Sequence, residues 1–221
     1  MCAARGGSEA VGASPTGSGG HDALRCDAVR YLIRHGHTAL NALHEVHGRF
    51  DDPLDARGQL EAAALGELFA QVPLEAVYAS PLQRARQTAA PVAAAAGLEV
   101  IVEPLLMDRD YGPWTGRAKA DVIAKFGRVD DAPGIELWRT FADRSAEAFL
   151  TLADRHGDAP VALVAHDAIN QAVIWQLFPG RWKEHTVIPQ RNGCWNRLDL
   201  MDNGQWDLVV LDALPGDGTK P

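Results

Sequence analysis

Short apolar runs alternate along this chain with longer segments in which apolar residues recur at helical spacing. The short runs cover residues 29–33, 76–79 and 161–165, and their β-branched and aromatic side chains predict buried strands. Between residues 58 and 72, apolar side chains at helical spacing share the segment with Gln and Glu, which predicts an amphipathic helix. Similar patterns predict helices from residue 81, over 135–156 and over 168–178.

The order of these elements indicates the fold class. Strands that alternate with helices favour a mainly parallel sheet covered on both faces, so we expect an α/β protein built as a three-layer α/β/α sandwich. Two further strands, 194–200 and 206–211, flank an Asp-Asn-Gly turn and predict a hairpin at one sheet edge. Ser80 and Pro81 are typical of a helix N-cap and first turn, and Pro91 is expected to bend or restart that helix.

Candidate chemistry follows the first predicted strand. Arg34, His35 and Gly36 come directly after the run 29–33, and open α/β sheets place ligands at the ends of their strands. A histidine nitrogen can attack phosphorus when a neighbouring cation keeps it unprotonated and binds the phosphate oxygens. The alternative at this point is structural, because Arg and His at strand ends also form surface salt bridges or helix caps.

Several longer blocks follow in order along the chain. They lie at residues 34–41 (RHGHTALN), 52–59 (DPLDARGQ), 78–88 (YASPLQRARQT), 106–116 (LMDRDYGPWTG) and 161–166 (VALVAH). With these blocks the chain resembles the histidine phosphatase superfamily, whose members include the cofactor-dependent phosphoglycerate mutases. The resemblance implies a phosphoglycerate mutase-like fold and metal-independent hydrolysis of a small phosphorylated metabolite, with no cofactor.

The resemblance also implies roles for individual residues. His35 would be the nucleophile that forms a phosphohistidine, while Arg34, Arg84 and His166 would hold the non-bridging phosphate oxygens. Guanidinium groups suit this task because they donate two parallel hydrogen bonds to a phosphate. The further substrate-binding candidates are His37, Thr38, Asn41 and Asp167.

The proton donor to the leaving group is less certain from the sequence. Most relatives of this size carry Glu in the block where this chain has Asp108, and Asp can perform the same task from a closer backbone. Asp167 is a rival, because a His-Asp pair at the second histidine contains the donor in the acid phosphatase and phytase branch. We favour Asp108, since its surrounding block matches the small phosphatases and Asp167 also suits the first turn of a helix.

Composition bounds the remaining possibilities. The chain has 221 residues, a formal net charge of -8 and 47% hydrophobic residues, which predicts one domain and argues against nucleic acid as a partner. We expect a flexible Gly/Ser/Ala-rich tail at 1–26, a single domain at 27–213 and a flexible C-terminus at 214–221. No signal peptide or long apolar run is evident, so we expect no membrane contact and a cytoplasmic location. The sequence does not specify the oligomeric state.

Three alternative functions stay open. His35, His37, His44 and His47 could contribute to a metal site, although we expect no metal and place His44 and His47 in a solvated loop near the mouth of the site. A mutase would need paired arginines that shield the phosphoenzyme, and no adjacent Arg pair occurs between residues 117 and 165. A non-catalytic phosphate-binding protein is disfavoured by the intact histidines and arginines. Residues expected at the pocket mouth are Arg49, Phe50, Arg109, Tyr111, Trp114 and Arg117.

Overall fold

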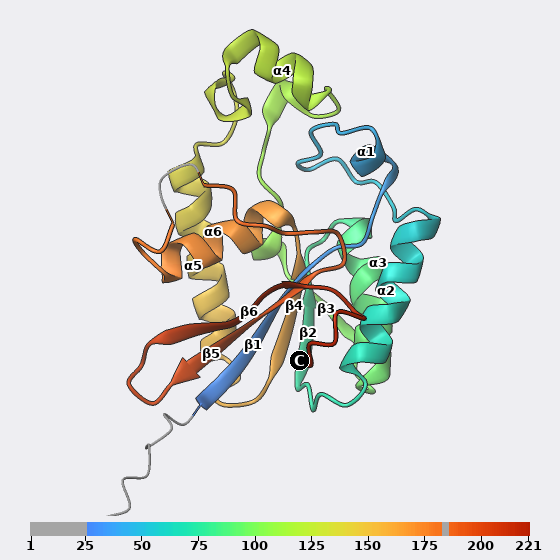
Figure 1. Cartoon of the computed structure of the whole chain (residues 1–221), viewed down its shortest axis with the longest axis vertical. Coiled ribbons are helices and arrows are strands. Elements are labelled where there is room, and N and C mark those ends of the chain that lie inside the picture. Colours follow the sequence, from blue (N-terminus) through green and yellow to red (C-terminus); the bar gives the residue numbers. More distant parts are fainter. Residues whose placement is uncertain (1–25, 183–185) are drawn as a thin grey trace, which may run out of the picture.

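The computed structural model describes residues 26–182 and 186–221, and its centre is a six-stranded sheet (Figure 1). The strand order is β3-β2-β4-β1-β5-β6. β1, β2, β3 and β4 pair in parallel, whereas β5 and β6 add an antiparallel hairpin at one edge. The strands are β1 (Cys26–Arg34), β2 (Ala76–Ala79), β3 (Val100–Val102), β4 (Val161–Ala165), β5 (Trp195–Met201) and β6 (Trp206–Ala213).

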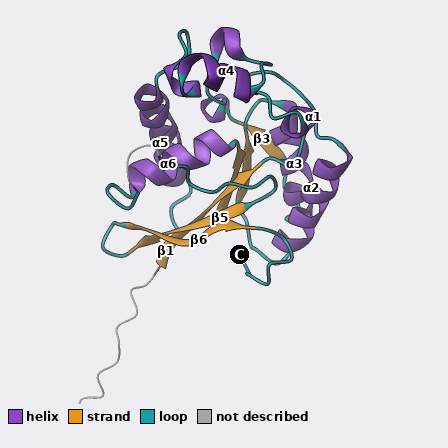
Figure 2. Cartoon of the chain, turned by 45° about the horizontal axis from the view of Figure 1, so that its top comes forward, coloured by secondary structure: helices purple, strands orange, loops and turns teal. Residues whose placement is uncertain are grey.

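Helices cover both faces of the sheet, as Figures 1 and 2 show. α2 and α3 pack on one face and α5 and α6 on the other, while α1 and α4 lie beyond the strand ends. The predicted three-layer α/β/α sandwich is therefore confirmed. The helices are α1 (Ala39–Ala42), α2 (Ala56–Phe69), α3 (Gln83–Ala95), α4 (Lys119–Phe126), α5 (Trp138–Asp154) and α6 (Asp167–Leu177), with short 3-10 turns η1 (Pro104–Leu106), η2 (Gly112–Trp114) and η3 (Val129–Asp131).

Alternation along the central strand divides the apolar core between the two faces. Tyr31 and Ile33 of β1 pack with α2 and α3, whereas Leu32 packs with α5 and α6. Side chains that alternate in this way follow from the two-residue period of a strand. Because β1 and β4 lie between the two helical layers, their C-terminal ends are held from both sides.

The start of α3 differs from the prediction. Ser80 was expected as its N-cap, yet α3 begins at Gln83 after Leu82, which makes no side-chain capping bond. Ser80 is buried and hydrogen-bonded to His166 instead, so its hydroxyl is used in tertiary contact. The expected restart at Pro91 is also wrong, because α3 runs through that residue as one helix.

The two ends of the chain leave part of the domain prediction untested. Residues 1–25 of the predicted tail lie outside the described residues, and Cys26 already belongs to β1. In the C-terminal segment, Asp217 forms an ion pair with Arg191 at 3.2 Å, and the flexibility expected there stays a prediction. None of the helices in the described ranges combines the length and apolar character that a membrane span needs.

Two glycines hold the turn after β1 against the first turn of α2. A Cβ atom added to Gly58 would lie 2.1 Å from the carbonyl oxygen of His37, and one added to Gly36 would lie 2.6 Å from the oxygen of Gly58. Side chains do not tolerate such distances, so both positions need glycine for close backbone approach. The turn that carries His35 is thereby fixed against the helical layer.

We predict that Gly58→Ala lowers the free energy of unfolding by about 1–3 kcal/mol, because the added methyl group overpacks a backbone contact. The same change displaces the turn at His35 and lowers the activity of the site that this turn carries. Denaturant titration and steady-state kinetics measure the two effects. Gln59→Ala is the matched control, since Gln59 is exposed on the same helical turn and its truncation costs less than about 0.5 kcal/mol. Equal stability of the two variants would contradict the argument.

Candidate active site

The two predicted histidines meet where two neighbouring parallel strands end. His35 follows β1 and His166 follows β4, and Arg34 is paired in register with Ala165. The centroids of the two imidazole rings lie 5.3 Å apart. Arg84, from the first turn of α3, also reaches this point. Sequence-distant residues thus form one buried cluster.

His35 is held as a neutral imidazole with one nitrogen facing the cluster. Its Nδ1 donates to the carbonyl oxygen of Gly36 at 2.7 Å, while Nε2 accepts from Arg84 Nε at 3.2 Å. Burial lowers the pKa of His35 well below its usual value, and the positive charges of Arg84 and Arg34 add to this effect. Nε2 therefore keeps a lone pair, which a nucleophile needs.

Arg84 is a fully buried cation whose guanidinium is surrounded by acceptors. Each of its three nitrogen atoms donates to at least one acceptor, so the charge is satisfied within the protein. Two of these donors face groups that would react with a substrate, His35 and Asp108. The contacts are Nε to His35 Nε2 (3.2 Å), Nη1 to Phe50 O (2.6 Å) and Asp52 Oδ1 (2.9 Å), and Nη2 to Gly48 O (2.8 Å) and Asp108 Oδ2 (3.1 Å).

Two further polar atoms in the cluster are buried and have no hydrogen-bond partner within the described residues. They are Nδ1 of His166 and Nε of Arg34. His166 is oriented by Ser80, whose Oγ lies 2.8 Å from its Nε2, and Arg34 donates through Nη1 to Gln190 O. Burial lowers the pKa of His166 as well, with Arg84 the next cause. An anion bound here would give these orphaned groups a partner.

Asp108 and Asp167 differ in their electrostatic surroundings. Burial raises the pKa of Asp108 to about 6 despite the opposing charge of Arg84. Its Oδ2 lies 3.5 Å from His166 Nδ1. For Asp167, burial favours the neutral form, but Arg34 and Lys119 hold the pKa below its usual value; the Arg34 contact is 3.9 Å. A carboxyl group whose pKa is raised in this way stays protonated to higher pH than an ordinary aspartate, which suits a general acid.

The loop that carries Asp108 is fastened to the start of α5. Arg144 donates to the carbonyl oxygens of Met107 and Asp108 at 3.0 and 3.2 Å. Its guanidinium also binds the carboxylate of Glu136 at 2.6 and 2.9 Å, and Glu136 accepts from the backbone N–H of Asp110 at 3.0 Å. Arg144 and Glu136 therefore hold the backbone on both sides of Asp108 and so position its side chain. The sequence showed no sign of this contact.

Of the six substrate-binding candidates, Asp167 lines the cavity, Arg34 and Arg84 belong to the buried cluster, and the other three make local contacts. His37 donates through Nδ1 to Asp55 at 2.6 Å. Thr38 and Asn41 form the reciprocal capping box of α1, and Asn41 also accepts from Asn192 at 3.0 Å. The structure therefore places these side chains in local contacts beside His35, and their role toward substrate stays a prediction.

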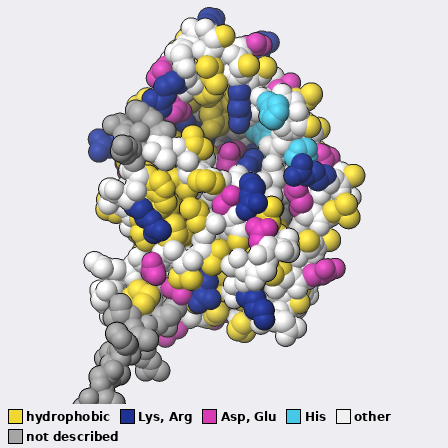
Figure 3. Space-filling model, viewed as in Figure 1, with side chains coloured by type: hydrophobic (Ala, Val, Ile, Leu, Met, Phe, Trp, Pro, Cys, Tyr) yellow, Lys and Arg dark blue, Asp and Glu magenta, His cyan; other side chains and the backbone are white. Residues whose placement is uncertain are grey.

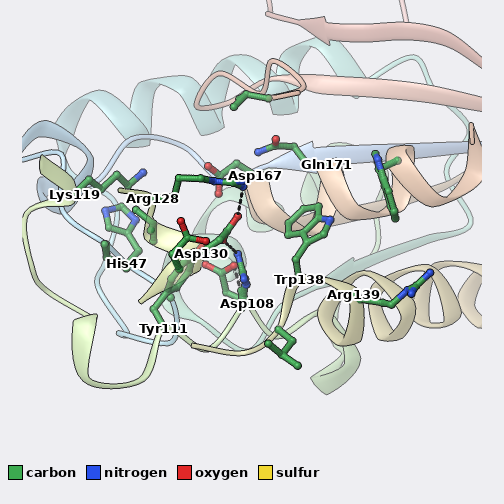
Figure 4. A pocket seen from close by; sticks show the side chains of 18 of the residues that line it. His47, Asp108, Tyr111, Lys119, Arg128, Asp130, Trp138, Arg139, Asp167 and Gln171 are labelled. Carbon is green, nitrogen blue, oxygen red and sulfur yellow. Dashed lines mark hydrogen bonds and ion pairs between the residues drawn. The ribbon is translucent and has the colours of Figure 1, made fainter. Parts of the chain in front are cut away.

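A cavity of about 830 Å³ opens beside the buried cluster. On the face of the molecule seen in Figure 3, histidine, basic and acidic side chains surround a hollow in the upper half. Of the residues expected at its mouth, Arg109 and Tyr111 line it, whereas Arg49, Phe50, Trp114 and Arg117 do not. The lining includes His47, Asp108, Lys119, Trp138, Asp167 and Gln171, which Figure 4 labels, and also Trp175.

His47 corrects one expectation of the sequence analysis. It was expected to be a solvated loop residue near the mouth of the site. It lines the cavity, but its side chain is partly buried and its ring centroid lies 6.4 Å from that of His35. Its Nε2 is buried without a partner among the described residues. His44, by contrast, is exposed as expected. Across the described ranges, no group of three or more His, Cys, Asp or Glu side chains is arranged to hold a metal ion.

Comparison with known proteins identifies relatives along most of the chain. A glucosyl-3-phosphoglycerate phosphatase from Mycobacterium tuberculosis is 28% identical, over 84% of this chain and 86% of its own. A probable phosphoglycerate mutase from Salmonella choleraesuis is 34% identical, over 80% and 86%. A phosphoserine phosphatase 1 from Hydrogenobacter thermophilus is 34% identical, but the match spans about half of each chain, 43% of this one and 45% of the relative.

A solved structure and a protein-family model match the same region of the chain. The crystal structure of a putative α-ribazole-5′-P phosphatase from Escherichia coli has a TM-score of 0.74 at 25% identity, covering 84% of this chain and 97% of that one. A model of the histidine phosphatase superfamily, branch 1, matches residues 30–213. The chain therefore belongs to branch 1 of the histidine phosphatase superfamily, as a phosphatase of the histidine phosphatase type.

Proposed function

We propose that the protein hydrolyses phosphomonoesters of small metabolites through a phosphohistidine on His35, without a metal ion. The observation that carries this proposal is the environment of His35, whose Nε2 is unprotonated and faces the guanidinium of Arg84 at 3.2 Å. Small phosphorylated molecules also appear in the names of relatives, which include phosphoserine and glucosyl-3-phosphoglycerate phosphatases.

The first step transfers the phosphoryl group to His35. A bound phosphate takes over the donors that Arg84 now directs at His35 and Asp108, and it also reaches the orphaned Arg34 Nε and His166 Nδ1. His35 Nε2 then forms a bond to phosphorus while the bond to the ester oxygen breaks, and Asp108 donates its proton to that oxygen. The negative phosphate also weakens the Arg84 contact to Asp108, which favours the protonated acid.

The second step returns the site to its starting state. Asp108, now a carboxylate, accepts a proton from water as the water oxygen bonds to phosphorus and the bond to Nε2 breaks. The alcohol has already left after the first step, and inorganic phosphate leaves after the second. Each proton lost by Asp108 in the first step is recovered in the second, so the cycle needs no cofactor.

Hydrolysis is favoured over transfer to a second substrate by the open cavity. Asp108, the group that would activate water, lines a space of about 830 Å³ that water can enter. The sequence offers no adjacent Arg pair between residues 117 and 165 to shield the phosphoenzyme. Retention of the phosphoryl group would need such protection.

We expect His35→Ala to lower hydrolysis of an aryl phosphate by about 10³-fold or more, since no other described group is placed as a nucleophile. Activity of the unmodified protein should be unaffected by EDTA. Acid-labile labelling by a radioactive phosphoester should be absent from the variant. His44→Ala, an exposed histidine of the same loop region, is the control. Activity that EDTA removes would point to a metal-dependent mechanism instead.

The pH dependence should identify the acid. Because a general acid works in its protonated form, kcat/KM for an alkyl phosphate should fall as pH rises through about 6, the raised pKa of Asp108. The low pKa of His35 keeps the nucleophile active below that value. The activity lost in Asp108→Asn should be at least about tenfold greater for alkyl than for aryl phosphates. Aryl leaving groups are less basic and depend less on protonation by an acid. The assignment fails if Asp167→Asn has this leaving-group dependence and Asp108→Asn does not.

The clamp on the acid-bearing loop can be tested separately. Arg144→Ala frees the carbonyl oxygens of Met107 and Asp108, so we expect activity on alkyl phosphates to fall about tenfold or more through misplacement of the acid. Aryl phosphates should be affected less. Arg155→Ala removes an ion pair between the half-exposed Arg155 and the buried Glu103 at the other end of α5 and is the control. A uniform loss for both substrate types would indicate a general structural effect.

A further inference from the structure

One face of α6 leads away from the buried histidines along the cavity. Asp167, Gln171 and Trp175 all line the cavity and lie four residues apart on this helix, a spacing that places them on one face. At 1.5 Å per residue, Trp175 lies about 12 Å along the helix axis from Asp167. The indole therefore marks the outer end of the cavity rather than the phosphate cluster.

A second indole lines the same cavity from the start of α5. Trp138 has the guanidinium carbon of Arg109 5.4 Å from its ring centroid, and the same carbon lies 5.4 Å from the ring of Tyr111. Arg109 is fixed in turn by the carbonyl oxygen of Glu136 at 2.9 and 2.8 Å. Figure 4 shows Trp138 projecting into the cavity next to Asp108. The ring is thus held rigidly on the side of the general acid where a leaving group departs.

Away from the histidines, the cavity is lined by apolar and aromatic side chains together with polar and charged ones, among them Thr186 and Arg139. Leu137 and Val187 line it and remain 72% and 77% exposed, although large apolar side chains are usually buried. Gln171 uses its Oε1 to accept from Ile188 N at 3.2 Å, and its amide N–H groups have no hydrogen-bond partner among the described residues. Aromatic and apolar side chains accompanied by a few hydrogen-bonding groups are typical of a pocket for a ring.

We propose that Trp138 and Trp175 form a ring-binding subsite for the leaving group, so that the preferred substrates are phosphomonoesters whose leaving group ends in an aromatic ring. This inference rests on the proposed function, because the phosphate must lie at His35 for the ring to reach the indoles. A leaving group of three carbon atoms is too short to reach Trp175. Flat rings gain from stacking on fixed aromatic side chains, whose orientation costs no further entropy on binding.

The test compares two substrates that differ only in the distal ring, butyl phosphate and 4-phenylbutyl phosphate. Their ester oxygens are chemically equivalent, so the ratio of kcat/KM values reports contacts remote from the reacting bond. We expect this ratio to be about tenfold or more in the unmodified protein. Trp175→Ala and Trp138→Ala should lower it toward one, whereas Trp175→Phe should keep most of it. Leu150→Ala, an exposed change on α5 outside this cavity, should leave the ratio unchanged.

The outcomes separate this inference from the proposed function. Equal hydrolysis of both substrates by the unmodified protein overturns the ring subsite and leaves phosphomonoester hydrolysis intact. A high ratio that survives both Trp→Ala changes also overturns it, because the ring then binds elsewhere. Failure to hydrolyse either substrate overturns the proposed function, and the subsite falls with it.

Discussion

The buried charge of Arg84 is the constraint on which the rest of the site depends. A guanidinium removed from water must be surrounded by acceptors, and here those acceptors come from the segment 48–52, from His35 and from Asp108. The one cation therefore draws together three segments that are distant in the sequence. It also lowers the pKa of His35 and opposes the effect of burial on Asp108, so a single charge influences both the nucleophile and the acid.

Much of this arrangement could be predicted from the sequence. Apolar runs that end at Arg34 and at His166 indicate strands of one parallel sheet, and parallel strands bring their ends to the same edge. The hairpin at the edge follows from the Asp-Asn-Gly turn. The contacts of Ser80, His47 and Arg144 could not be predicted in this way, because each depends on a partner from another part of the chain. Local patterns favoured a helix cap for Ser80 and a solvated loop for His47, and tertiary packing overrode both.

The acid lies between two environments with different chemistry. On one side of Asp108 are the arginines and histidines that suit a phosphate, and on the other is a cavity lined by indole rings. Arg109 connects the two, since it follows Asp108 in the chain and lies beside Trp138. In the proposed mechanism, reaction type and leaving-group preference are therefore carried by different side chains, so that substitutions in the cavity alter preference without changing the groups that transfer phosphate.

The close contact between Gly36 and Gly58 has a consequence for motion. Because neither glycine has a Cβ atom, the backbone of each lies close against the backbone of the facing segment. Gly36 N also donates to Thr88 Oγ1 of α3 at 3.0 Å. The turn at His35 can open only if it separates from α2 and α3 together. These contacts restrain the turn more than the few contacts of a surface loop would. The proposed nucleophile is therefore held in place by two helices before a substrate binds.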